Sequence, residues 1–309
     1  MKQHFISVLS LLLCGGSMLA SQPNGASQPQ MLINASQQGL MAPVWSPQGD
    51  KIAVTTDNYN GILIANADGS NLRQLTDASG AGYKMMWSAD GKEILGRTNV
   101  VENARVFHEV KVWDIESGNA TTLVSKTRDL KGTPTWKSAS NIVVADRIGV
   151  KSVNTKTLAT ASSSSNAYEL MVNDPVGATA KLPALTAYAK SIVINPAISP
   201  DGQKVAFQIP GKGMFVCDID GNNLISFGKG SNPAWMPDSE NLIFTRTTDD
   251  GQRFTSSDIY SININSKKEY LLTGNTDLIP RRPSVSPDGQ KVVFENAADA
   301  SIYSVNLKY

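Results

Sequence analysis

Histidine is almost absent from this 309-residue chain, and its absence excludes several kinds of chemistry. The chain has two histidines, His4 and His108, and His4 lies in a segment that we expect to be removed. The usual multi-histidine metal site cannot be built from His108 alone. A Ser-His-Asp hydrolase is disfavoured as well, since His108 would be its only base and the chain has no Gly-x-Ser-x-Gly elbow. We therefore predict no catalytic residues, no metal and no cofactor.

Cysteine is equally scarce, which limits covalent cross-linking. The two cysteines are Cys14 and Cys217, and Cys14 lies in the same N-terminal segment as His4. If that segment is removed, Cys217 has no partner within the chain. The fold must then be held by packing without a disulfide.

The chain also lacks an excess of charge of either sign. Lys and Arg number 28 and Asp and Glu number 27, so the formal net charge is +1. Such a balance creates no field that would collect nucleic acid or an anionic membrane. Nucleic acid is therefore not among the expected partners.

An apolar run near the start of the chain, from Phe5 to Leu13, follows Lys2 and precedes small residues. It is shorter than the roughly 20 residues of a membrane-spanning helix, and its flanks are typical of a secretory signal. We expect residues 1–21 to be the signal, residues 22–28 to be a flexible tether, and the mature part to be a periplasmic or secreted bacterial protein without a membrane span. Lipid anchoring through Cys14 is the alternative, which Leu13 disfavours because lipoprotein signals carry a small residue there.

One phrase recurs along the rest of the chain: a short apolar strand, a turn such as Ser-Pro-Asp-Gly, and a β-rich run. In such a turn Pro presets φ, Asp caps the turn and Gly accepts positive φ. Asp68-Gly69 and Asp220-Gly221 mark a second hairpin in two copies, so one unit is four antiparallel strands. Six copies begin at Ala42, Tyr83, Thr133, Asn195, Asn232 and Arg282.

A four-stranded unit that recurs every roughly 40 to 60 residues predicts the blades of a β-propeller. Four copies carry a Trp at the end of the inner strand, which we expect to fill the layer between neighbouring blades. The final segment stops after a third strand, so residues 29–35 are predicted to complete the last blade and close the ring. We therefore predict an all-β fold, with residues 29–309 as a single propeller.

The number of blades depends on the long step from Trp136 to Ile198. Further β-like segments lie within it, among them residues 168–173 and 180–185, which resemble the second half of a blade. No clear inner strand precedes them. We favour six blades, with seven as the alternative.

The phrase Pro-x-Trp-Ser-Pro-Asp-Gly, followed by a β run, Asp-Gly and Leu-Thr, resembles the WD-like repeats of the TolB type. The copies at Pro43, Pro196 and Pro283 match best. The resemblance covers the propeller part alone, without the N-terminal domain of TolB. It implies a periplasmic or surface propeller that binds a protein or a glycan at the mouth of its channel, while some related propellers are polysaccharide lyases.

The expected binding face carries the loops between second and third strands and between blades, because these are longer and more varied than the turns opposite. Four of them span residues 96–109, 126–132, 245–257 and 274–282. We expect a monomer that binds an envelope or secreted protein there, with a carbohydrate-binding or carbohydrate-cleaving propeller as the alternative. Arg and Tyr are frequent interface anchors, and the candidate binding residues are Tyr59, Tyr83, Arg105, His108, Arg128, Arg246, Arg253, Phe254, Arg281 and Arg282.

Overall fold

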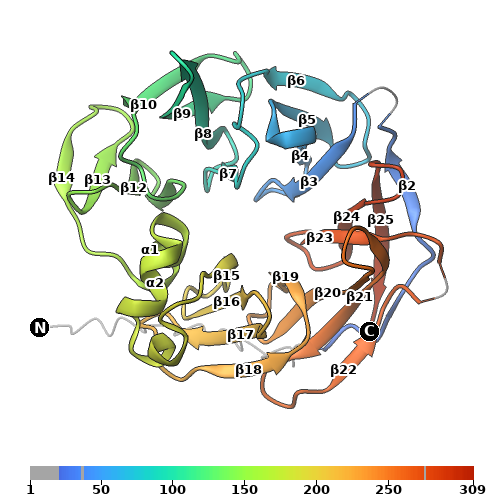
Figure 1. Cartoon of the computed structure of the whole chain (residues 1–309). Helices are drawn as coiled ribbons and strands as arrows, with labels where there is room; N and C mark the ends of the chain where they lie inside the picture. Colours follow the sequence, from blue (N-terminus) through green and yellow to red (C-terminus); the bar gives the residue numbers. More distant parts are fainter. Residues whose placement is uncertain (1–20, 36–37, 275) are drawn as a thin grey trace, which may run out of the picture.

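The computed structural model describes residues 21–35, 38–274 and 276–309, so the expected signal and Cys14 lie almost entirely outside the described residues. Six sheets of antiparallel strands stand in a ring around a central channel (Figure 1). This confirms the predicted six-bladed, all-β propeller. Within the described part of the chain, no helix is long and apolar enough to cross a membrane.

Each blade runs from an inner strand at the channel to an outer strand at the rim (Figure 1). The strands of blades 1 to 3 are β3 (Leu40–Trp45), β4 (Lys51–Thr56), β5 (Ile62–Asn66) and β6 (Arg73–Thr76); β7 (Met86–Trp87), β8 (Glu93–Glu102), β9 (Arg105–Asp114) and β10 (Ala120–Thr127); and β11 (Thr135–Ser138), β12 (Asn141–Ala145), β13 (Val150–Asn154) and β14 (Thr160–Ser162).

The second half of the ring repeats the same strand order. The strands of blades 4 to 6 are β15 (Ile194–Ile198), β16 (Lys204–Ile209), β17 (Gly213–Asp218) and β18 (Ile225–Gly228); β19 (Ser231–Trp235), β20 (Asn241–Asp249), β21 (Phe254–Asn263) and β22 (Glu269–Leu271); and β23 (Pro280–Val285), β24 (Lys291–Asn296) and β25 (Ile302–Lys308).

The repeated turn between the first two strands of a blade is fixed by its Ser and Asp. In blade 4 the Ser199 hydroxyl donates to the Asp201 carboxylate at 2.5 Å and accepts from the Lys204 amide at 2.9 Å. The same carboxylate accepts the Gln203 amide at 3.0 Å. Asp90 and Asp288 make the corresponding bonds in blades 2 and 6, so the turn chemistry inferred from the sequence is present.

The tryptophans link neighbouring blades by hydrogen bonds as well as by packing. The indole Nε1–H groups of Trp87, Trp136 and Trp235 donate to main-chain carbonyls of the preceding blade at 3.2, 3.3 and 2.9 Å. Each acceptor stands directly before the Trp position of its own blade. The predicted place of these rings between blades is therefore correct, and the polar edge of each ring adds a directional contact.

The ring closes through the N-terminal segment. Strands β1 (Gly25–Ala26) and β2 (Gln30–Ile33) both pair antiparallel with β25, end to end along its outer edge. Residues 22–28 are therefore not a free tether: Gln22 Nε2 donates to the Lys268 carbonyl, and the Pro23 carbonyl accepts the Ser261 hydroxyl. These contacts cover the edge that β25 would otherwise expose.

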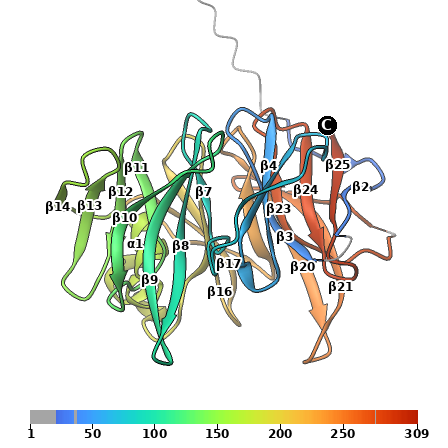
Figure 2. The same cartoon turned by 90° about the horizontal axis from the view of Figure 1, so that it is seen from above.

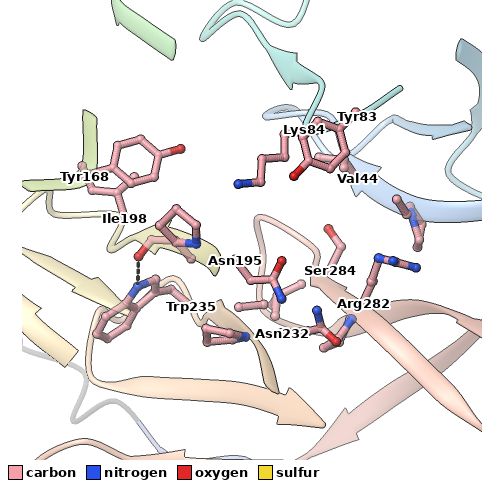
Figure 3. Close-up of a pocket in the computed structure, with 18 of the residues that line it drawn as sticks. Val44, Tyr83, Lys84, Tyr168, Asn195, Ile198, Asn232, Trp235, Arg282 and Ser284 are labelled. Carbon is pink, nitrogen blue, oxygen red and sulfur yellow. Dashed lines mark hydrogen bonds between the residues drawn. The ribbon is translucent and has the colours of Figure 1, made fainter. Parts of the chain in front are cut away.

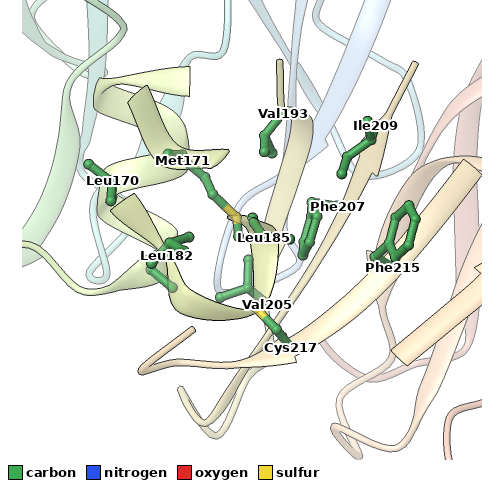
Figure 4. Close-up of a cluster of buried hydrophobic side chains, with 12 residues drawn as sticks. Leu170, Met171, Leu182, Leu185, Val193, Val205, Phe207, Ile209, Phe215 and Cys217 are labelled. Atoms are coloured by element: carbon green, nitrogen blue, oxygen red, sulfur yellow. The ribbon is translucent and has the colours of Figure 1, made fainter. Parts of the chain in front are cut away.

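Helices stand where the sequence suggested two further strands. Residues 168–173 lie in α1 (Ala167–Asn173), and residues 180–185 fall in α2 (Pro175–Lys181) and the 3-10 helix η2 (Pro183–Tyr188). Helix α1 contacts both β12 and β15 and so fills the junction between blades 3 and 4. Figure 4 shows the cluster in which Met171 and Leu185 pack on Val205 and Phe207 of blade 4. The strand interpretation of this segment was wrong.

Candidate functional site

A cavity of about 480 Å³ occupies the central channel. Inner strands β3, β15, β19 and β23 form most of its wall. Tyr59 and Tyr83, from connections on one face, and Tyr168, from α1, also line it. Figure 3 shows Lys84 entering from one side and Asn195 and Asn232 from the other. The cavity is therefore lined by residues from most of the ring.

One position of the repeat supplies a side chain to this cavity again and again. Ala42, Lys84, Asn195, Asn232 and Arg282 all line the cavity, and all have positive φ, between 47° and 53°. In blades 1, 4, 5 and 6 the residue precedes a Pro within a β-bulge, where the pairing register skips one residue. Positive φ is unfavourable for all of them except Asn, so the fold holds Ala42, Lys84 and Arg282 in a strained conformation.

Blade 3 breaks this pattern because a helix covers it. The corresponding residue, Thr133, is buried, and its amide donates to the Val172 carbonyl of α1 at 3.3 Å. Gly132 lies so close to α1 that a Cβ would stand 2.3 Å from the same carbonyl. On this side of the ring the cavity is lined instead by Tyr168 of α1.

Arg282 belongs to a network that joins the first and last blades. Its guanidinium forms an ion pair with the buried Glu295 carboxylate and donates to the Tyr59 hydroxyl at 2.9 Å. The other carboxylate oxygen of Glu295 accepts the amide of Ala42 at 2.7 Å. The charge of Arg282 is thus neutralised, and the bulge of blade 1 is held by the same acid.

Three further cations near the mouth have no such partner. Within the described residues, Lys84, Arg97 and Arg281 form no ion pair with a carboxylate. The Tyr83 ring lies 5.6 Å from Lys84 Nζ and 5.8 Å from the Arg97 guanidinium, while Arg281 stacks on Phe254 at 4.0 Å. Aromatic rings attract cations but leave their net charge in place.

Burial acts on the protonation of all three cations. It lowers the pKa of Lys84 to about 8, and repulsion by Arg97 acts in the same direction. Burial also lowers the pKa of Arg97 and that of Arg281. The neighbouring Arg282 lowers the pKa of Arg281 further, whereas Glu295 raises it. At the mouth, burial therefore disfavours the charged forms of these three side chains.

Two long β-hairpins project on the face that carries the connections between second and third strands (Figure 2). Residues 96–109 and 245–257, expected as loops, instead continue the strands of β8–β9 and β20–β21 as far as Glu102–Arg105 and Asp249–Phe254. The hairpins belong to blades 2 and 5, which stand opposite one another in the ring (Figure 1). Val101 and Val106 face each other at the tip of the first and are 69% and 49% exposed.

The structure brings only some of the predicted binding residues together. Tyr59, Tyr83 and Arg282 line the cavity, and Arg281 with Phe254 lies beside it. Arg246 is held in a bidentate ion pair with Glu269, and His108 Nδ1 lies 3.0 Å from the Asn99 amide oxygen. Burial, followed by Arg97, lowers the pKa of His108. The remaining three are exposed, at hairpin ends or between β10 and β11: Arg105, Arg253 and Arg128.

Sequence reasoning missed several cavity residues, because they stand at a position that looks like an ordinary variable site. The signal was present, since Asn tolerates positive φ better than most residues and recurs before Pro in two copies of the phrase. Arg97 gives no signal of this kind, and its place beside Tyr83 comes from the fold alone. The missed residues that line the cavity are Lys84, Tyr168, Asn195 and Asn232, and Arg97 lies outside the lining, against the Tyr83 ring. In the residues that the structure describes, no three His, Cys, Asp or Glu gather as a metal site.

The chain resembles several solved structures at low identity. TolB from Acinetobacter baumannii has a TM-score of 0.50 at 14% identity, over 87% of this chain and 63% of that one. Tricorn protease has 0.53 at 13%, over 87% of this chain and 26% of that one, and oligogalacturonate lyase from Vibrio parahaemolyticus has 0.49 at 13%, over 92% and 98%. At such identities the likeness shows the fold alone, and this chain spans less than two thirds of the TolB structure.

Sequence comparison gives the family. No curated protein matches the chain. The family model described as TolB beta propeller domain matches residues 149–308, more than half of the sequence. This chain therefore belongs to the TolB beta propeller domain family.

Proposed function

We propose that this propeller is a non-catalytic, exported binding module that holds a segment of an envelope or secreted protein at the mouth of its channel. The observation that carries the proposal is the mouth itself: a cavity of about 480 Å³ framed by Tyr59, Tyr83, Lys84 and Arg282. Aromatic and Arg side chains in a partly desolvated pocket are the usual anchors of a protein interface.

The surroundings of the mouth favour a protein over a glycan. The tip pair Val101 and Val106 projects beside it, and Ile148, in the corresponding loop of blade 3, is 87% exposed. Exposed apolar side chains that share one face suit a protein partner. A sugar platform, by contrast, needs an exposed Trp, and Trp45, Trp87, Trp113 and Trp235 are all buried.

The test compares two single substitutions of equal chemistry on opposite faces. Val106→Asp places a charge on the hairpin tip, whereas Leu158→Asp does so at a residue that is also 49% exposed but lies in a turn of the other face. The immobilised mature chain and both variants are exposed to envelope proteins, and retained proteins are identified by mass spectrometry.

We expect the parent and Leu158→Asp to retain the same protein and Val106→Asp to lose it. A photo-crosslinking residue in place of Arg105 should then join that protein to the hairpin tip. If both variants retain the protein equally, the chosen face is wrong. If nothing is retained and acidic or neutral oligosaccharides bind instead, the carbohydrate alternative replaces the proposal.

A further inference from the structure

The cavity has an unbalanced set of charges. Its lining includes Lys84 and Arg282 and no Asp or Glu. The buried Glu295, which does not line the cavity, neutralises Arg282. The ammonium group of Lys84 is then the charge inside the cavity that has no ion-pair partner among the described residues. Arg97, which lies 5.8 Å from the Tyr83 ring and donates to the Gly132 carbonyl, and Arg281 add positive charge and form no ion pair with a carboxylate.

Holding this charge is unfavourable in the unliganded protein. A half-buried ammonium group loses hydration and gains no ion pair in return, and its neighbours are cations and phenols. Its backbone conformation, with φ at 53°, adds strain that Gly or Asn at this position would largely avoid. Unfavourable electrostatics and backbone strain at one cavity position are typical of a site whose ligand supplies the missing interaction.

Hydrogen-bond donors stand opposite Lys84. Within the described residues the Asn232 NH₂ group has no acceptor, and its amide oxygen lies 3.5 Å from the Thr245 hydroxyl, which donates to the Ser231 carbonyl at 3.1 Å. Asn195 donates one amide N–H to the Gln208 side-chain oxygen at 3.3 Å, and its second N–H is available to a ligand. A ligand between Lys84 and these amides meets donors from both sides, which suits an acceptor-only group such as a carboxylate.

Resting on the proposed function, we propose that the partner inserts an acidic segment, with an Asp or Glu carboxylate bound between Lys84 and the amides of Asn195 and Asn232. Lys84 is then the residue that determines specificity for a charged over a neutral segment. Arg97 and Arg281 stabilise further acidic residues at the rim, because they lie next to residues that line the cavity and form no ion pair with a carboxylate.

The probes are acetylated, amidated hexaglutamate and hexaglutamine peptides and a trigalacturonate, each measured by calorimetric titration against the mature chain. The variants are Lys84→Gln, which removes the charge, and Lys84→Arg, which keeps it. Lys267→Gln is the matched control, since Lys267 also has positive φ, at 57°, but lies in an exposed turn of the opposite face. Thermal melts establish that each variant is folded.

We expect hexaglutamate to bind and hexaglutamine to bind at least tenfold more weakly. Lys84→Gln should weaken hexaglutamate binding by about ten- to a hundredfold, the effect of losing a hydrogen bond to a charged group. Lys84→Arg should remain within about threefold of the parent, and Lys267→Gln should be unchanged.

The pH profile separates a bound ammonium from a merely structural one. The groups facing Lys84 are Tyr83 beside it, Arg97 of β8, Tyr168 of α1, and Tyr59 with Arg282 across the cavity. Burial raises the pKa of Tyr83, and raises that of Tyr168 to about 12. Hexaglutamate affinity should therefore be constant from pH 6 to 7 and fall as pH rises through about 8, whereas Lys84→Arg should show no fall.

Equal binding of the two peptides, or equal binding of hexaglutamate by parent and Lys84→Gln, overturns the inference. Lys84-dependent binding of trigalacturonate without hexaglutamate overturns it as well, because the carboxylate then comes from a glycan. The two proposals fail separately: if Lys84→Gln still retains the envelope protein that Val106→Asp loses, the proposed function stands and the acidic segment does not.

Discussion

Two tryptophans at equivalent positions allow the inter-blade hydrogen bond to be measured on its own. Trp235 and Trp45 are 8% and 7% exposed, so their rings are buried to the same extent. The Trp235 indole donates to the Ala197 carbonyl at 2.9 Å, whereas the Trp45 Nε1 is buried without a partner. Replacing each by Phe therefore removes a similar apolar area but only one hydrogen bond.

The size of the effect follows from this difference. Both substitutions leave a smaller ring in the layer between blades, and that loss is common to the two variants. Trp235→Phe additionally deprives the Ala197 carbonyl of its donor, whereas Trp45→Phe deletes a polar group that had no partner. The free energy of unfolding of Trp235→Phe should therefore be lower than that of Trp45→Phe by about 1–2 kcal/mol.

Urea unfolding followed by circular dichroism measures the difference, with equal m-values required of both variants. Trp87→Phe serves as the second case, because Trp87 donates to Val44 at 3.2 Å, and it should behave like Trp235→Phe. A loss of stability in Trp45→Phe as large as in the other two variants would refute the reasoning, since packing alone would then account for all three.

Three further predictions concern closure, burial and charge. Gly69→Ala should lower the free energy of unfolding in urea by about 1–3 kcal/mol, because φ is 82° and a Cβ would stand 2.2 Å from the carbonyl of Leu32 in β2; an unchanged midpoint would contradict this closure. Cys217 is buried, which raises its pKa to about 12, so iodoacetamide at pH 8 should label it only in urea, as peptide masses will show. The hydrogen bond from Ser199 is the main cause that lowers the pKa of Asp201 below its ordinary value of 3.8. The ionised carboxylate therefore stabilises the fold above pH 3.8, and this stabilisation is lost as the pH falls below that value. The fall in melting temperature between pH 5 and pH 3 should be smaller for Asp201→Asn than for the parent.

The blades could be predicted because their chemistry is local and repeated. The Ser-Pro-Asp-Gly turn uses atoms within a few residues of one another, as Ser199 and Asp201 show. The Trp at the end of the inner strand marks the contact with the next blade. A repeated unit of this kind cannot bury its faces alone, so the number of copies predicts the ring.

The helices at the junction of blades 3 and 4 were missed although their start signals are in the sequence. Asn166 accepts the Glu169 amide, and the Glu169 carboxylate accepts the Asn166 amide, which is a capping box. Asp174 followed by Pro175 is a helix start as well, with Pro at the first helical position. The expectation of a regular repeat outweighed these signals, and apolar residues were interpreted as alternating strands.

The sequence allowed the face of the propeller that carries the candidate site to be selected, but only some of the residues of that site. Tyr59 and Arg282 could be selected from their loops, but the hydrogen bond that Arg282 donates to the Tyr59 hydroxyl joins elements near the two ends of the chain. The bulges that turn Asn195 and Asn232 into the channel depend on strand register. Register is set by the pairing of neighbouring strands, so it does not follow from the sequence of one strand taken alone.

The repeat separates stability from recognition within a single phrase. The residues that recur in most copies make structural contacts: Ser and Asp fix the turn, and Trp joins the blades. The residue before Pro varies from Ala42 to Asn195 to Arg282, yet the bulge directs it into the channel in each case. Arg282 is an exception, because its ion pair with the buried Glu295 belongs to the network that joins the first and last blades. At the other positions the side chain makes few of the bonds that hold a blade together, so substitutions there change the lining of the cavity at little cost to the fold.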